Sequence, residues 1–149
     1  MIRLAILENT AKVITDHLLR SGDIEQGVFC LVRLGKGNRG VRLLVTEVLL
    51  PPADAWEYQE RDILRPSARW ISSAVSRAIE TQSGLLFIHS HPHSQYPIGL
   101  SSADIVAFCS LAKTLTPCSM VPSRELLYTL SDGQECCGQM ALWLPLTAL

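Results

Sequence analysis

The sequence lacks several features that would point to whole classes of function. Its 13 basic and 14 acidic residues leave a formal net charge of −1. Lysine and arginine form no cluster, so nothing favours a nucleic-acid-binding protein. The apolar tail 140–149 is about half a membrane span, and the apolar run 4–7 is too short for the core of a signal peptide. We therefore expect no nucleic-acid partner and no membrane attachment.

Regular cysteine spacing is also missing. The five cysteines are an odd number, and the neighbours Cys136 and Cys137 cannot easily bond each other. Cys109 falls in an apolar stretch that reads as core. This pattern favours a reducing compartment over a disulfide framework, and we predict a cytoplasmic protein.

A phosphate-binding loop is absent as well. The glycine-rich segment 35–40 matches neither a P-loop nor the pattern G-x-G-x-x-G, and no predicted helix follows it. We interpret it as a turn between two strands.

What the chain does have is the composition of a compact globular protein. It has 149 residues, of which 48% are hydrophobic and 18% charged. A chain of this length forms one domain that buries roughly two thirds of its unfolded surface. We predict a single domain over residues 1–149.

Hydrophobic periodicity predicts an α/β (α+β) fold in which helices flank a mixed β-sheet. Residues 51–65 are polar and irregular and are predicted to form a surface loop. The tail from residue 140 is predicted to be a closing edge strand. The predicted helices are 9–19, 67–81 and 102–115, and the predicted strands are 2–7, 28–34, 41–50, 84–88, 119–121, 126–130 and 140–144.

The clearest chemical signal is His-Ser-His-Pro at 89–92, directly after the apolar strand 84–88. Side chains alternate between the faces of a strand, so a chain extended through Ser90 would place His89 and His91 on one face. Neutral imidazole is a common zinc ligand, and a catalytic zinc ion takes three protein ligands and one open position. Asp104 is the candidate third ligand, because a strand, loop and helix can return it to the histidines.

Each of these pieces also has an ordinary structural explanation. Ser101-x-x-Asp104 is typical of a helix N-terminus, with Ser101 as the cap and Asp104 in the first turn. Paired histidines occur on surfaces by chance. Three of the four histidines nevertheless lie at 89, 91 and 93, which favours a metal site. The fourth, His17, fits a partly packed surface residue.

His-Ser-His-Pro, a loop and then Ser-x-x-Asp resemble the JAB/MPN (JAMM) metalloproteases, over residues 2–144. These zinc isopeptidases remove ubiquitin or ubiquitin-like modifiers, or process their tails. The resemblance implies an MPN domain of cytidine-deaminase-like architecture that holds one zinc ion with His89, His91 and Asp104. It also implies that Glu25, at the start of the strand after the first helix, is the general base, and that the Ser101 hydroxyl stabilises the oxyanion.

Two departures from the family pattern leave alternatives open. The family usually has seven residues between the second histidine and the serine, whereas nine separate His91 from Ser101. Counting from His93 restores seven and would make His91 and His93 the ligand pair. We keep His89 and His91, because His-Ser-His-Pro directly after an apolar strand is the more specific match. In addition, Gly27 follows the glutamate by two positions instead of three.

The resemblance further implies a hydrolysis in which Glu25 takes a proton from zinc-activated water and passes it to the leaving amine. Glu47 is the next candidate base, although a solvated strand residue is its simpler interpretation. The compact chain resembles prokaryotic members, so the expected partner is a ubiquitin-like or sulfur-carrier protein whose tail ends in glycine. Segments 53–62 and 92–100 are the expected walls around that tail.

Other functions fit the residues less well. A zinc deaminase needs His-x-Glu and Pro-Cys-x-x-Cys, but Val121 stands where the second cysteine would follow Cys118. A Cys-His hydrolase needs an exposed thiol of low pKa near a histidine, and nothing in the order of residues supports one. The remaining alternative is a metal-free MPN-like scaffold that binds partners without catalysis. Such relatives typically lose one or more of the ligands that this chain keeps.

Overall fold

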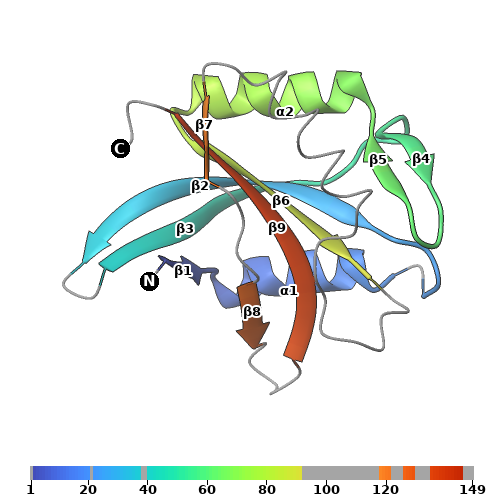
Figure 1. Ribbon diagram of the computed structural model, residues 1–149, viewed down its shortest axis with the longest axis horizontal. Coiled ribbons are helices and arrows are strands. Elements are labelled where there is room, and N and C mark those ends of the chain that lie inside the picture. Colours follow the sequence, from blue (N-terminus) through green and yellow to red (C-terminus); the bar gives the residue numbers. More distant parts are fainter. Residues whose placement is uncertain are drawn as a thin grey trace.

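A computed structural model describes residues 2–20, 22–37, 40–91, 118–121, 126–129 and 135–145 (Figure 1). Among these residues, two helices flank the large sheet, α1 (Glu8–Leu18) and α2 (Ala68–Glu80). The strands of that sheet are β1 (Ile2–Ala5), β2 (Gly27–Gly37), β3 (Gly40–Leu49), β6 (Gly84–Ser90), β7 (Cys118–Val121), β8 (Leu126–Thr129) and β9 (Glu135–Pro145).

The large sheet is mixed, as the sequence predicts. Its strands run in the order β1-β3-β2-β6-β9-β7, and β8 also pairs with β9. β1 is parallel to β3, and the other pairs are antiparallel. The predicted helices 9–19 and 67–81 are confirmed with ends that differ by one residue. The predicted helix 102–115, which contains Cys109, lies outside the described residues.

Two predictions about strands are wrong. The tail from residue 140 is not an edge strand, because β9 pairs with β6 on one side and with β7 and β8 on the other. Residues 51–65 are not an irregular loop, because they contain β4 (Trp56–Gln59) and the start of β5 (Leu64–Pro66). These two short strands form a separate antiparallel hairpin. With only four and three residues, the two strands are too short to show the alternation by which strands are recognised.

The core has one half on each face of the sheet. On β2, Val28 and Cys30 point into the half that α1 covers, whereas Phe29 and Leu31 point into the half that α2 covers. The two helices accordingly lie on opposite sides of the sheet (Figure 1). The second half is rich in aromatic rings, with Phe29 centred 4.7 Å from Trp70. Side chains alternate between two covered faces, so residues 27–32 of β2 and all seven residues of β6 are buried.

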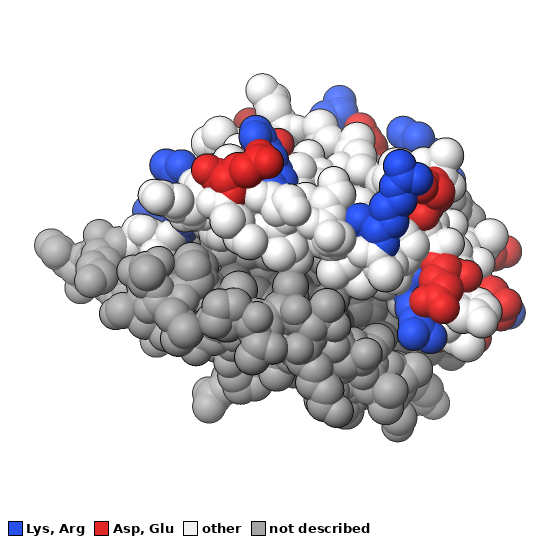
Figure 2. All heavy atoms as spheres, turned by 90° about the horizontal axis from the view of Figure 1, so that it is seen from above, with Lys and Arg blue, Asp and Glu red and all other residues white. Residues whose placement is uncertain are grey.

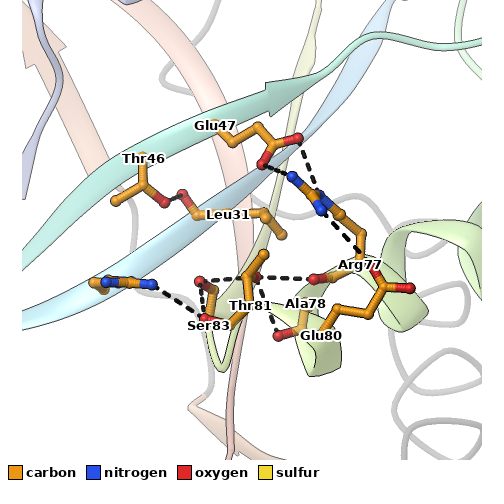
Figure 3. Close-up of polar contacts among 9 residues, drawn as sticks. Leu31, Thr46, Glu47, Arg77, Ala78, Glu80, Thr81 and Ser83 are labelled. Atoms are coloured by element: carbon orange, nitrogen blue, oxygen red, sulfur yellow. Dashed lines mark hydrogen bonds and ion pairs between the residues drawn. The ribbon is translucent and has the colours of Figure 1, made fainter.

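Two arginines of α2 form exposed ion pairs. Arg77 lies between Glu47 of β3, at 3.1 Å, and Glu80, at 3.6 Å (Figure 3). Arg69 pairs with Asp54 at 3.0 Å. Over the described part of this face, acidic and basic side chains lie beside each other and no region of one charge forms (Figure 2). Neither described helix is long and apolar enough to cross a membrane.

Candidate metal centre

The candidate site lies where the central strand β6 ends. The strand is extended through Ser90, so His89 and His91 lie on the same side of it, as predicted from the alternation of side chains. Their ring centroids are 4.6 Å apart. His89 is buried with 2% of its surface exposed, whereas the His91 side chain is 16% exposed. The two imidazoles therefore form one cluster that reaches from the core to the surface.

Glu25 joins this cluster from the neighbouring strand. β2 pairs with β6 so that Gly27 lies opposite His89, which brings the residues just before β2 next to those just after β6. Glu25 Oε1 lies 2.8 Å from His91 Nδ1. The glutamate is only 3% exposed, and a buried carboxylate is costly unless it is paired or binds a metal. The contact with His91 supplies such a pairing.

The three side chains fit a metal ion by their chemistry and spacing. Each offers one ligand atom, and these atoms all lie within 4.8 Å of one another. Two imidazoles and a carboxylate are a donor set used by catalytic zinc sites. Two ligands of one tetrahedral zinc ion lie about 3.3 Å apart, because each bond is about 2.0–2.1 Å long. The set could therefore hold one metal ion.

Phe87, two residues before His89 on β6, packs against the His89 side chain. The Phe87 ring stacks on the His89 ring, with centroids 5.7 Å apart and an angle of 22° between the planes. Gly27 makes room for this ring, because a Cβ at that position would lie 2.7 Å from the Phe87 ring and 2.9 Å from Leu64. The glycine two residues after Glu25 is thus required by a close approach beneath the site.

The β4–β5 hairpin holds the backbone of Glu25. The Glu25 N–H donates to the Glu60 carbonyl at 3.3 Å, and the Gln59 side-chain amide donates to the Glu25 carbonyl at 3.1 Å. Sequence reasoning placed segment 53–62 beside the site as a wall but missed the role of Gln59. A lone glutamine in a polar segment carries no signal of such a contact.

Three residues named from the sequence, Ser101, Asp104 and His93, lie outside the described residues. The structure brings together Glu25 and the histidine pair, and it places Glu47 elsewhere, in its ion pair with Arg77.

Two other titratable groups have environments that argue against a role at the site. His17 on α1 is partly buried, as expected, and burial lowers its pKa despite a hydrogen bond with the Gly27 backbone that raises it. Cys30 is a free cysteine in the core, and burial raises the pKa of its thiol to about 12. A thiol that stays protonated is a poor nucleophile. Cys30 therefore offers no support for a cysteine hydrolase.

Comparison with models of known protein families gives no match for this chain, and comparison with curated proteins gives none either. The JAB/MPN resemblance therefore rests on the motifs in the sequence.

Proposed function

We propose that the chain is a zinc-dependent isopeptidase or peptidase of the JAB/MPN type that acts on the C-terminal tail of a ubiquitin-like modifier. The observation that carries this proposal is the convergence of Glu25, His89 and His91, whose ligand atoms lie within 4.8 Å of one another. The order His-Ser-His-Pro and Ser-x-x-Asp in the sequence adds Asp104 as the third zinc ligand and Ser101 as a hydrogen-bond donor.

Each side chain in this proposal has a separate task. A bound zinc ion supplies Lewis acidity, which polarises a carbonyl group and makes water a better nucleophile near neutral pH. Glu25 accepts the proton of the attacking water and returns it to the leaving amine. Ser101 donates to the carbonyl oxygen as negative charge develops there. The proximity of Glu25 to His91 supports this assignment, because a base must lie within reach of the nucleophile.

The expected substrate is an extended, glycine-rich tail. Such a tail can add as a strand to an open sheet edge, where main-chain hydrogen bonds set its register. The β4–β5 hairpin is the proposed wall on one side, because Glu60 and Gln59 bond the backbone of Glu25. Segment 92–100, which follows the histidines in the sequence, is the proposed wall on the other side.

Metal analysis tests the zinc centre directly. The purified protein should contain one zinc ion per chain by elemental analysis, and His89→Ala or His91→Ala should abolish it. His17→Ala is the matched control, because this histidine lies on α1 and should leave zinc in place. Asp104→Asn should weaken zinc binding strongly and change the zinc-free melting temperature little.

The outcomes discriminate between the candidates. Zinc lost in His93→Ala but kept in His89→Ala would shift the pair to His91 and His93. Unchanged zinc affinity in Asp104→Asn would reduce Asp104 to a helix cap. A folded native protein without zinc, even after incubation with the metal, would favour the metal-free scaffold.

A cleavage assay tests the substrate class. Ubiquitin-like proteins encoded near this gene, fused through their tails to a reporter, should be cut by the zinc-loaded protein. Replacement of the penultimate tail glycine by a bulky residue should block cleavage, because narrow walls exclude larger side chains. Equal cleavage of both tails would show that these walls do not select the tail residues.

A further inference from the structure

Ser90 stands between the two histidines but faces the other way. Alternation along β6 puts its side chain on the face opposite His89 and His91, and it is buried with 7% of its surface exposed. Its N–H donates to the Gln26 carbonyl at 2.9 Å. Its hydroxyl accepts from the Gln26 N–H at 3.0 Å. Two short hydrogen bonds thus join Ser90 to the residue that follows Glu25.

These bonds add one more pair of opposite residues, Gln26 and Ser90, to the ladder between β2 and β6. In an antiparallel ladder, every second pair of opposite residues exchanges two backbone hydrogen bonds. The register between β2 and β6 ends with Gly27 opposite His89. At the next position, Ser90 gives one bond from its backbone and takes the other with its side chain. The hydroxyl therefore extends the pairing by one residue, to the point immediately before Glu25 and His91.

This Ser90–Gln26 pair lies next to both halves of the site. Glu25 precedes Gln26 and His91 follows Ser90, so each lies one residue beyond this pair, and their side chains meet at 2.8 Å. The backbone bonds described for Glu25 itself go to Glu60 and to the Gln59 side chain, both on the hairpin. Those bonds fix Glu25 to the hairpin and not to β6. The bonds at Ser90 add to the pairing of β2 with β6 and join the residue next to Glu25 to the strand that leads to the histidines.

We infer that Ser90 is a positioning residue, whose hydroxyl holds the end of β6 against the neighbouring chain, fixes the positions of His89 and His91, and thereby tunes metal affinity. The inference rests on the metal centre proposed above. Partners that orient metal ligands typically change affinity about 10- to 100-fold when they are removed, so the effect of the hydroxyl can be measured without any substrate.

The experiment compares two buried serines at opposite ends of β6. Ser83, just before the strand, is 6% exposed, and its hydroxyl accepts from the Thr81 hydroxyl at 3.1 Å. Ser90→Ala and Ser83→Ala each remove one buried hydroxyl, but only the first touches the site. Zinc affinity is measured by competition with a chromophoric chelator, and the free energy of unfolding by urea titration. Hydrogen exchange of the Gln26 amide is followed in the zinc-free protein.

We expect Ser90→Ala to bind zinc about 10- to 100-fold more weakly and to exchange its Gln26 amide faster. Ser83→Ala should lose stability without losing zinc affinity. Ser90→Thr, which keeps the hydroxyl, should restore both zinc affinity and protection of the Gln26 amide.

Three results would overturn the inference. They are native zinc affinity in a folded Ser90→Ala protein, an equal loss of affinity in Ser83→Ala, and rapid exchange of the Gln26 amide in the native protein. The last result needs no variant and applies even where Ser90→Ala fails to fold. A native protein that binds no zinc would instead refute the metal centre itself, and the inference with it.

Discussion

The buried carboxylate of Glu25 can serve a metal site as a base or as a ligand, and its amide analogue separates the two. We expect Glu25→Gln to keep its zinc and to lose about 10²- to 10⁴-fold in rate, because an amide cannot accept the proton. Zinc content and cleavage rate should be measured on the same sample. Glu47→Gln is the matched control, since Glu47 pairs with Arg77, and it should change neither quantity.

Two outcomes would revise this assignment. Loss of zinc in Glu25→Gln would make Glu25 a ligand, which the spacing of its oxygen from the histidines also allows. A rate close to that of the native protein would move the base to another carboxylate.

A second prediction for a single residue concerns Gly27. A methyl group there would push on the Phe87 ring, which is 2.7 Å from the added Cβ and packs against Phe29 and Trp70. Overpacking of this kind costs about 1–3 kcal/mol. We expect Gly27→Ala to lose that much stability by urea titration. It should also bind zinc more weakly, because Phe87 stacks on His89.

Gly35 on the same strand is the control for this prediction. A Cβ at Gly35 would make only an ordinary contact, 3.7 Å from the Arg42 carbonyl. Gly35→Ala should therefore leave zinc affinity unchanged. A Gly27→Ala protein as stable as Gly35→Ala would show that the aromatic rings around Phe87 shift to accept the added methyl group without loss of stability.

At the scale of elements, α2 begins at a capping serine. The Ser67 hydroxyl accepts from the Trp70 N–H at 3.3 Å and donates to the Asp54 carbonyl at 3.0 Å. We expect Ser67→Ala to lower the free energy of unfolding by about 1 kcal/mol, since a cap of this kind satisfies an otherwise unpaired helix N–H. Ser73→Ala, on the exposed side of α2, should be neutral or slightly stabilising. Equal values for the two variants in urea titration would contradict the capping role.

The elements that could be predicted are those with a local pattern. The spacing of Ile14 and Leu18 marks one helix face, and the apolar run before His89 marks β6. β9 was misplaced at an edge because alternation within a strand says nothing about its neighbours. The β4–β5 hairpin could not be predicted because its strands have only four and three residues, too few to show a pattern.

The candidate site likewise has a part that could be predicted from the sequence and a part that could not. The pairing of His89 with His91 follows from a period of two along one strand and could be predicted. The contact between Glu25 and His91 depends on the register of β2 against β6, which pairs residues far apart in the sequence, such as Gly27 with His89. Only the family resemblance pointed to Glu25. Nothing in the sequence assigned a role to Ser90 or to Gln59.

At the scale of the whole molecule, His17 links stability to pH. Burial lowers its pKa in the folded protein from the ordinary value of 6.5, so the unfolded chain binds more protons just below pH 6.5. The free energy of unfolding should therefore keep this contribution above pH 6.5 and lose it as the pH falls towards the lowered pKa. Urea titrations of the zinc-free protein from pH 7.5 to pH 5 would measure the loss.

The His17→Gln variant isolates this contribution from those of other groups. It cannot titrate at position 17, so its stability should fall less steeply over the same pH range. Parallel curves for the native and variant proteins would show that protonation of His17 is not linked to unfolding.

The position of β9 has a consequence for biosynthesis. The strand that carries the histidines ends at Ser90, but the partner on its second side begins only at Glu135. A ribosome therefore completes β6 well before it makes β9, and all seven residues of β6 are buried in the finished fold. An apolar strand with an open edge is a template for pairing with other chains. A chain that stops before Glu135 would lack this partner, so the strand that leads to both histidines would keep an open edge that can pair with other chains.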